Sequence, residues 1–205
     1  DTTISRNSAD RGGGLFNLAS TLNVTASTLY HNSAGIGGAI ENQRGFVTIS
    51  ASAISENSSS GNGGAISHII SGTFDIVDST LTSNLAGDHG GGIFVSLVGG
   101  GALTVSDSTL SANTAGGRGG GIFSTRGSYS ITGSTVSDNV AHEGGGIYNA
   151  SFGNMTVTDT TISRNSADRG GGLFNLASTL NVTASTLYHN SAGIGGAIEN
   201  QRGFV

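Results

Sequence analysis

A short glycine motif returns along the whole chain at a nearly constant interval. The first copy is Gly12-Gly13-Gly14-Leu15, and each later copy keeps two glycines, then glycine or alanine, then isoleucine or leucine. Successive copies lie 25 to 29 residues apart. Their third residues are Gly14, Ala39, Ala65, Gly92, Gly121, Gly146, Gly172 and Ala197. A near-constant period of this length is typical of a solenoid, in which each repeat forms one coil stacked on the previous one.

Two further features recur with the glycines. One is a stretch in which apolar and polar residues alternate, as in Leu22 to Thr25 and Leu103 to Ser106, and this alternation is typical of a strand with one buried face. The other is an asparagine ten residues after the start of that stretch. The asparagines are Asn7, Asn32, Asn57, Asn84, Asn113, Asn139, Asn165 and Asn190. We expect them to form an internal ladder, with each side-chain amide bonded to its neighbours one coil away.

The constant spacing inside the strands, with variable spacing only between them, predicts strands that pair in register from coil to coil. We therefore predict an all-β fold, a right-handed single-stranded parallel β-helix. It would have about eight coils of 25–29 residues, three short strands per coil, and a single domain over residues 1–205. A helical solenoid is disfavoured, because Ser, Thr, Val, Gly and Asn have poor helix propensity and no 3.6-residue period is present.

Residues 159–205 repeat residues 1–47 without a single difference, at an offset of 158 residues. This offset corresponds to six coils, so the sequence predicts a six-coil unit over residues 1–158 and a partial second unit over residues 159–205. At about 4.8 Å per coil, one unit would advance the axis by roughly 29 Å. Three origins of this identity remain open: a natural tandem repeat, a segment of a continuous fibre, and a designed duplication. The sequence also starts inside a repeat, which indicates a mature fragment or a segment of a longer protein.

Composition excludes several classes of function. The net charge of −5, without a basic cluster, argues against binding to nucleic acid. No apolar run is long enough to span a membrane, so we expect no membrane insertion of this segment. The chain has no Cys and only five dispersed His, so we expect no disulfide, no metal site and no cofactor.

The repeated tetrapeptides resemble those of the parallel β-helix passengers of bacterial surface proteins, especially the polymorphic outer-membrane protein family. That family repeats Gly-Gly-Ala-Ile and Phe-x-x-Asn. The first tetrapeptide occurs intact at Gly37 to Ile40, Gly63 to Ile66 and Gly195 to Ile198. The second is approximate, since Ile4-Ser5-Arg6-Asn7 and Leu81-Thr82-Ser83-Asn84 replace Phe by an aliphatic residue. The resemblance implies a secreted, surface-exposed protein with an adhesive or scaffolding role.

One cluster of charged residues spans neighbouring coils, just before the glycine motif. If the protein is an enzyme, these residues are its candidate catalytic groups, because a carboxylate, an imidazole and two guanidinium groups can bind an acidic sugar or transfer protons. We name them the charged turn cluster: His89, Arg118, Glu143 and Arg169. The simpler interpretation, which we favour, is a solvated ladder of ion pairs, each worth little.

An aromatic residue follows the apolar residue of the glycine motif in several repeats. We predict an exposed stripe there, formed by Phe94, Phe123, Tyr148 and Phe174, with Phe16 in the same column. Two interpretations stay open for these rings: a contact surface for another molecule, and packing beneath loops or against each other.

The sequence thus favours a non-enzymatic structural repeat protein, extracellular or on the cell surface. We expect a segment of a surface filament, stalk or adhesin that assembles end to end and laterally with copies of itself, and that contacts host or matrix polysaccharide or protein. The rival is a carbohydrate-active β-helix enzyme of the polysaccharide lyase or hydrolase type. A distant third is an ice- or surface-binding module, because Thr, Ser and Asn line the polar face of the alternating strands.

Overall fold

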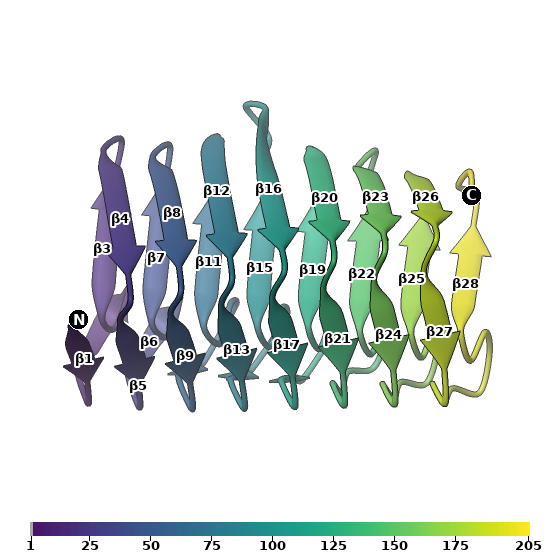
Figure 1. The fold of residues 1–205 in the computed structure, drawn as a ribbon, viewed down its shortest axis with the longest axis horizontal. Coiled ribbons are helices and arrows are strands. Elements are labelled where there is room, and N and C mark those ends of the chain that lie inside the picture. The colour runs from purple at the N-terminus through teal and green to yellow at the C-terminus, as the bar shows by residue number, and fades with distance from the viewer. Residues whose placement is uncertain (1) are drawn as a thin grey trace.

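A computed structural model describes residues 2–205 as a stack of coils made of β-strands and turns, without a helix in that range. Figure 1 shows the coils side by side, with the chain rising through β3 at the back and descending through β4 at the front as it advances. This winding is right-handed, as is usual for parallel crossovers. The predicted right-handed parallel β-helix of about eight coils is therefore confirmed.

Three long parallel sheets run the length of the stack, and each contains one strand from almost every coil. Sheet A contains β1 (Thr3–Ser5), β5 (Thr28–Tyr30), β9 (Ala53–Ser55), β13 (Thr80–Thr82), β17 (Thr109–Ser111), β21 (Thr135–Ser137), β24 (Thr161–Ser163) and β27 (Thr186–Tyr188). Sheet C contains β3 (Leu15–Leu18), β7 (Ile40–Gln43), β11 (Ile66–Ile69), β15 (Ile93–Ser96), β19 (Ile122–Thr125), β22 (Ile147–Ala150), β25 (Leu173–Leu176) and β28 (Ile198–Gln201). Sheet D contains β4 (Thr21–Thr25), β8 (Phe46–Ser50), β12 (Gly72–Val77), β16 (Gly101–Ser106), β20 (Ser128–Thr132), β23 (Asn154–Thr158) and β26 (Thr179–Thr183).

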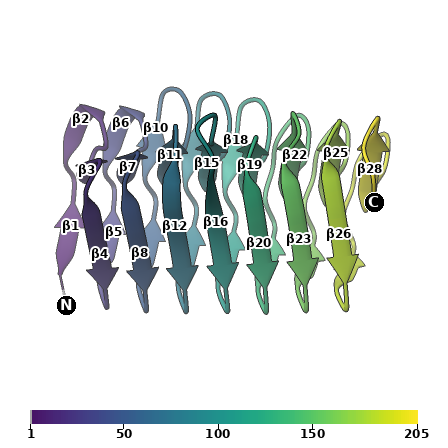
Figure 2. The same ribbon diagram turned by 90° about the horizontal axis from the view of Figure 1, so that it is seen from above.

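A fourth, short sheet adds to the three strands per coil that the sequence predicts. Sheet B contains β2 (Ser8–Arg11), β6 (Ser33–Ile36), β10 (Ser58–Ser59), β14 (Leu85–Ala86) and β18 (Thr114–Ala115). Beyond β18 the sheet continues as isolated bridges from coil to coil: Thr114 pairs with Val140, Val140 with Ser166, and Ser166 with Ser191. Figure 2 shows these short strands and the loops beside them along the edge opposite the arrowheads of sheet D.

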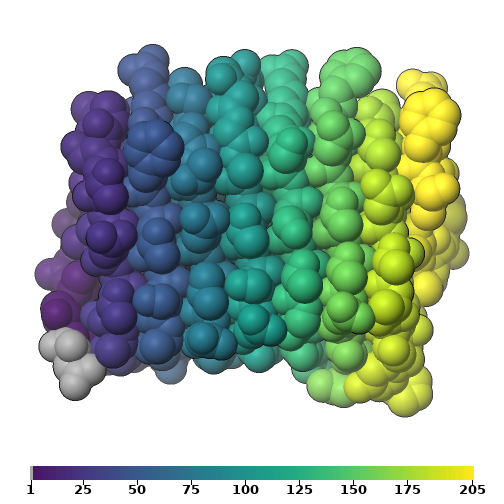
Figure 3. Space-filling model, turned by 45° about the horizontal axis from the view of Figure 1, so that its top comes forward, coloured from purple at the N-terminus to yellow at the C-terminus, as the bar shows by residue number. Residues whose placement is uncertain are grey.

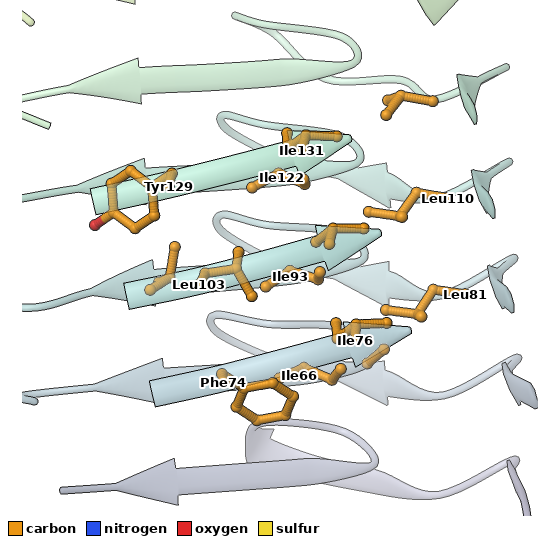
Figure 4. Packing of buried hydrophobic residues seen from close by; sticks show 14 of the residues in the cluster. Ile66, Phe74, Ile76, Leu81, Ile93, Leu103, Leu110, Ile122, Tyr129 and Ile131 are labelled. Atoms are coloured by element: carbon orange, nitrogen blue, oxygen red, sulfur yellow. The ribbon is translucent and has the colours of Figure 1, made fainter. Parts of the chain in front are cut away.

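The core is a set of columns, because equivalent residues lie directly above one another. Ile66 pairs in register with Ile40 and Ile93, and Ile93 pairs with Ile122. All four are fully buried. Figure 4 shows this column beside those of sheets A and D, with Ile76 and Ile131, and Leu81 and Leu110, at equivalent positions. One thin apolar core thus runs along the axis, and Figure 3 shows the coils as parallel bands on the surface around it.

Candidate functional site

The aromatic residues that follow the glycine motif form one continuous stack, which we call the aromatic column: Phe94, Phe123, Tyr148 and Phe174. They occupy the second position of β15, β19, β22 and β25, where the sheet register aligns them. Ring centroids of successive residues lie 5.1, 5.3 and 5.1 Å apart, with planes within 5° of parallel. Parallel strand pairing therefore fixes both the spacing and the tilt of the rings.

The prediction that these rings form an exposed stripe is wrong. Phe123, Tyr148 and Phe174 are only 7%, 1% and 1% exposed, and Phe94 is partly buried. Although the rings point away from the apolar core, the turns that lead into the glycine motif fold across them. Phe16 lies in the same column and is 47% exposed, but Glu41 and Ser67 separate it from the stack.

The charged turn cluster forms the cover over the aromatic column. Arg118 Cζ lies 5.3 Å from the ring centroid of Tyr148, and Arg169 Cζ lies 5.2 Å from that of Phe174. The imidazole of His89 stacks on Phe123 with centroids 4.9 Å apart. Cations held over aromatic faces gain a favourable interaction with the ring quadrupole, more so where water is excluded. The charged turn cluster and the aromatic column, which the sequence suggested as separate candidate sites, therefore form two layers of one structure.

Within this cover, the charges neutralise one another from coil to coil. Arg118 Nε donates to Glu143 Oε2 at 2.8 Å, and Arg169 Nη1 lies 3.9 Å from Glu143 Oε1. Arg169 also pairs with Glu199 in the next coil. The first coil repeats this arrangement, since Arg11 pairs with the buried Glu41. Burial raises the pKa of Glu41, and the hydrogen bond from Arg11 opposes that rise.

His89 is held as a neutral acceptor. Its Nδ1 accepts the backbone N–H of Arg118 at 3.2 Å, and burial, followed by the charge of Arg118, lowers the pKa of its imidazole. Above the cluster lies an open groove of about 540 Å³, lined by its four members together with Gly117, His142 and Asp168. The only carboxylate of the cluster is engaged by guanidinium groups, which favours an ion-pair ladder over a free catalytic base.

The asparagines that recur at coil spacing form one continuous ladder of hydrogen bonds. Asn113 Oδ1 accepts from the backbone N–H and the side-chain amide of Asn84, at 3.0 and 2.9 Å. Asn113 Nδ2 donates to Asn139 Oδ1 at 3.1 Å and to the carbonyl oxygen of Leu81 at 3.0 Å. Equivalent contacts join Asn7, Asn32, Asn57, Asn84, Asn113, Asn139, Asn165 and Asn190.

Sequence reasoning missed two further polar ladders. A second amide column occupies the third position of the sheet C strands, where Asn149 Nδ2 donates to Asn175 Oδ1 and Asn175 Nδ2 donates to Asn200 Oδ1, both at 2.9 Å. His68 replaces asparagine in this column and contacts Asn42. A hydroxyl column joins the turns between sheets D and A, as where Ser52 N donates to Ser79 Oγ. Recurrence of Ser27, Ser52, Ser79 and Ser108 at coil spacing is the signal that could have found it.

A comparison with protein-family models finds a match in the third coil. Residues 51–68 match the model of the Chlamydia polymorphic membrane protein repeat. This segment contains Asn57 of the ladder and the intact tetrapeptide Gly63 to Ile66. No curated protein and no solved structure matches the chain.

The matched family is a structural repeat of bacterial surface proteins and not an enzyme family, and it implies an outer-membrane or surface location. Within residues 2–205 there is no helix long and apolar enough to cross a membrane. The tetrapeptides and the β-solenoid together fit a polymorphic outer-membrane-protein-like β-helix repeat.

Proposed function

We propose that this chain is a structural segment of a bacterial surface filament, stalk or adhesin, built to be continued by further copies of its own six-coil unit. The supporting observation is a junction inside the chain. Residues 159–205 repeat residues 1–47, so the contact between the sixth and seventh coils is also the contact between one unit and the next.

All three long sheets cross this junction in register. In sheet A, β21 pairs with β24; in sheet C, β22 pairs with β25; and in sheet D, β23 pairs with β26. The copied coils then pair as the originals do, since Leu15 faces Ile40 and Leu173 faces Ile198. A second unit is therefore accepted without a break in strand pairing.

The side-chain columns cross the junction as well. Tyr148 stacks on Phe174 with centroids 5.1 Å apart, and Asn139 Nδ2 donates to Asn165 Oδ1 at 2.9 Å. Nothing chemically different marks the end of a unit, which suits a rod of uniform stiffness better than a string of separate domains.

Electron microscopy of the native surface material tests this proposal. We expect rods or filaments with an axial repeat near 29 Å, the advance of six coils at about 4.8 Å each. Isolated globular particles with no axial repeat near that spacing would contradict it.

The enzyme alternative has its own test. Acidic polysaccharides are incubated with the protein and with a Glu143→Gln variant, and the product is measured by absorbance and chain length. We expect no cleavage by either protein. Cleavage that disappears in Glu143→Gln would overturn the structural proposal.

A further inference from the structure

The turns of this β-helix form four columns, and in two of them basic and acidic side chains pair from coil to coil. In the turns after sheet A, Arg164 Nε donates to Asp138 Oδ1 at 2.7 Å, and His31 lies 3.2 Å from Glu56. In the turns before sheet C, the charged turn cluster is paired as described above. In both columns, basic and acidic side chains one coil apart contact each other.

The two columns that flank sheet D are different, because each carries charge of one sign. The turns from sheet C into sheet D carry Arg44, Arg126 and Arg202, which we call the cationic ridge. The turns from sheet D into sheet A carry Asp78, Asp107 and Asp159, which we call the anionic ridge. All six side chains are exposed, and within residues 2–205 none takes part in an ion pair.

The ridges run along opposite borders of sheet D. Figure 1 shows the turns of the cationic ridge along the upper edge of the molecule, and Figure 2 shows the turns of the anionic ridge beyond the arrowheads of sheet D. Sheet D strands of five or six residues separate the ridges by roughly 16–20 Å. That separation is too wide for the ridges to neutralise each other within one molecule.

A spacing of three coils occurs on both borders. Arg44, Arg126 and Arg202 precede the second, fifth and eighth rungs of sheet D, counting Phe204, which bridges to Thr179, as the eighth. Asp78, Asp107 and Asp159 follow its third, fourth and sixth rungs. The three arginines, and Asp78 with Asp159, therefore share a spacing of three coils, or roughly 14 Å, which divides the six coils of the repeating unit. Asp107 lies one coil after Asp78 and adds a further negative charge to the same border.

We propose that the two borders of sheet D are the lateral docking surfaces for a second copy of this chain, which lies beside the first, parallel and displaced by one coil. With that displacement, Arg44 of one copy faces Asp78 of its neighbour, and Arg126 faces Asp159. Sheet D of one copy then lies beside sheet D of the next. Because each copy carries one ridge on each border, the same charge pairing can be repeated across many copies. The inference rests on the proposed structural function, because it names the partner and the surface of its lateral assembly.

Exposed apolar rings support the same surface. Phe46, Phe152 and Phe204 lie in or beside the turns of the cationic ridge and are 56%, 82% and 78% exposed. A neighbouring copy would cover these rings, which adds buried apolar area to the charge pairing. Without a neighbour, the single-signed ridges stabilise nothing, and Asp78 and Asp107 in adjacent coils repel each other.

Reversing the charges tests the inference. One variant carries Arg44→Asp, Arg126→Asp and Arg202→Asp, so that both ridges are acidic. The other carries Asp78→Arg, Asp107→Arg and Asp159→Arg, so that both are basic. In sedimentation velocity at low salt, we expect the wild type to associate, each variant alone to associate at least tenfold more weakly, and an equimolar mixture to recover wild-type association. At about 1 M salt, where the screening length is about 3 Å, we expect the wild type to dissociate.

Two controls keep this test decisive. Asp138→Arg combined with Arg164→Asp reverses an equally exposed pair away from sheet D and should leave association unchanged. Far-UV circular dichroism verifies folding, and Arg→Gln variants of the cationic ridge replace any reversal that unfolds. A mixture that does not recover association, or a control that abolishes it, overturns the inference.

The register has a separate readout, because the chain contains no cysteine of its own. Arg126→Cys mixed with Asp159→Cys should cross-link through a short reagent, whereas Arg126→Cys mixed with Asp78→Cys, three coils away, should not. If the wild type stays monomeric at low salt while native material still has the axial repeat near 29 Å, lateral docking is wrong and the proposed function stands.

Discussion

At the level of single residues, the glycine motif is explained by contact between coils. Its first glycine has positive φ, as at Gly63 with φ of 71°, which a residue with a side chain adopts only with strain. At the second, a Cβ on Gly64 would lie 2.2 Å from the carbonyl oxygen of Gly91 in the next coil. The third position tolerates a methyl group, since Ala39 and Ala65 occupy it fully buried.

Alanine substitution separates the second and third positions. Gly64→Ala forces backbone apart between two coils, so we expect its free energy of unfolding to fall by about 3 kcal/mol or more. Gly92→Ala places the methyl group where other coils already hold one, but 2.7 Å from the carbonyl oxygen of Gly121, so the backbone must shift slightly and we expect a loss that is smaller than that of Gly64→Ala by about 1 kcal/mol or more. Chemical denaturation of the two variants measures the difference, and equal losses would contradict this explanation of the motif.

His68 is the one titratable side chain in the second amide column. It is fully buried, and its Nδ1 accepts from Asn42 Nδ2 at 3.0 Å, because Asn42 Oδ1 already accepts from Asn17. Its Nε2 has no hydrogen-bond partner within residues 2–205. Burial lowers the pKa of this imidazole to about 4, so the native state holds it neutral.

This burial predicts a loss of stability in acid. Since the native pKa of His68 lies below the unfolded value of 6.5, the unfolded state binds the proton first. The contribution of His68 is complete above about pH 6.5 and declines as the pH falls toward 4, by about 3 kcal/mol in all.

Denaturation across this pH range, with His68→Asn as the matched control, measures the effect. Asparagine occupies this column elsewhere, so we expect the variant to fold and to lose most of the decline between pH 6.5 and 4. Glu41, whose pKa burial raises, gives the opposite trend in both proteins and therefore drops out of the comparison. Parallel pH profiles would show that His68 is not the source.

At the level of strands and columns, the polar ladders hold the turns of neighbouring coils in register. Asn113 is fully buried and connects Asn84, Leu81 and Asn139. Each buried amide thereby satisfies backbone groups that the turns would otherwise leave without partners.

Removing one asparagine from the ladder should lower the free energy of unfolding. Asn113→Ala leaves the backbone N–H of Asn84 and the carbonyl oxygen of Leu81 without this partner, so we expect a loss of about 2–4 kcal/mol. Asn7→Ala is the control, because Asn7 is exposed and we expect less than about 1 kcal/mol there. Thermal or urea denaturation distinguishes the two, and a neutral Asn113→Ala would contradict the ladder's contribution to stability.

Strands and the asparagine ladder were predictable, because both depend on spacing that the sequence displays directly. The burial of the aromatic column could not be predicted. Alternation of apolar and polar residues shows which side of a strand faces the core, but it does not show whether a turn covers the other side. One sequence feature could have indicated the cover: an arginine precedes the aromatic residue by five positions at Arg11 and Phe16, and again at Arg169 and Phe174. The short strands of sheet B also escaped prediction, since two-residue strands such as Ser58–Ser59 have no detectable alternation.

At the level of the whole molecule, the same features continue from coil to coil across residues 2–205. The apolar core, three sheets and the asparagine ladder run from the first coils to the last, and they cross the repeat junction without interruption. Stability in such an array is a sum over coils and coil interfaces, so added units lengthen the rod without changing its cross-section.

Small-angle X-ray scattering on proteins with one, two and three tandem copies of the 158-residue unit tests this account most directly. We predict a constant cross-sectional radius and a length that grows by roughly 29 Å per added unit. A maximum dimension that grows by a different increment, or a cross-section that widens with each unit, would contradict the continuous β-helix.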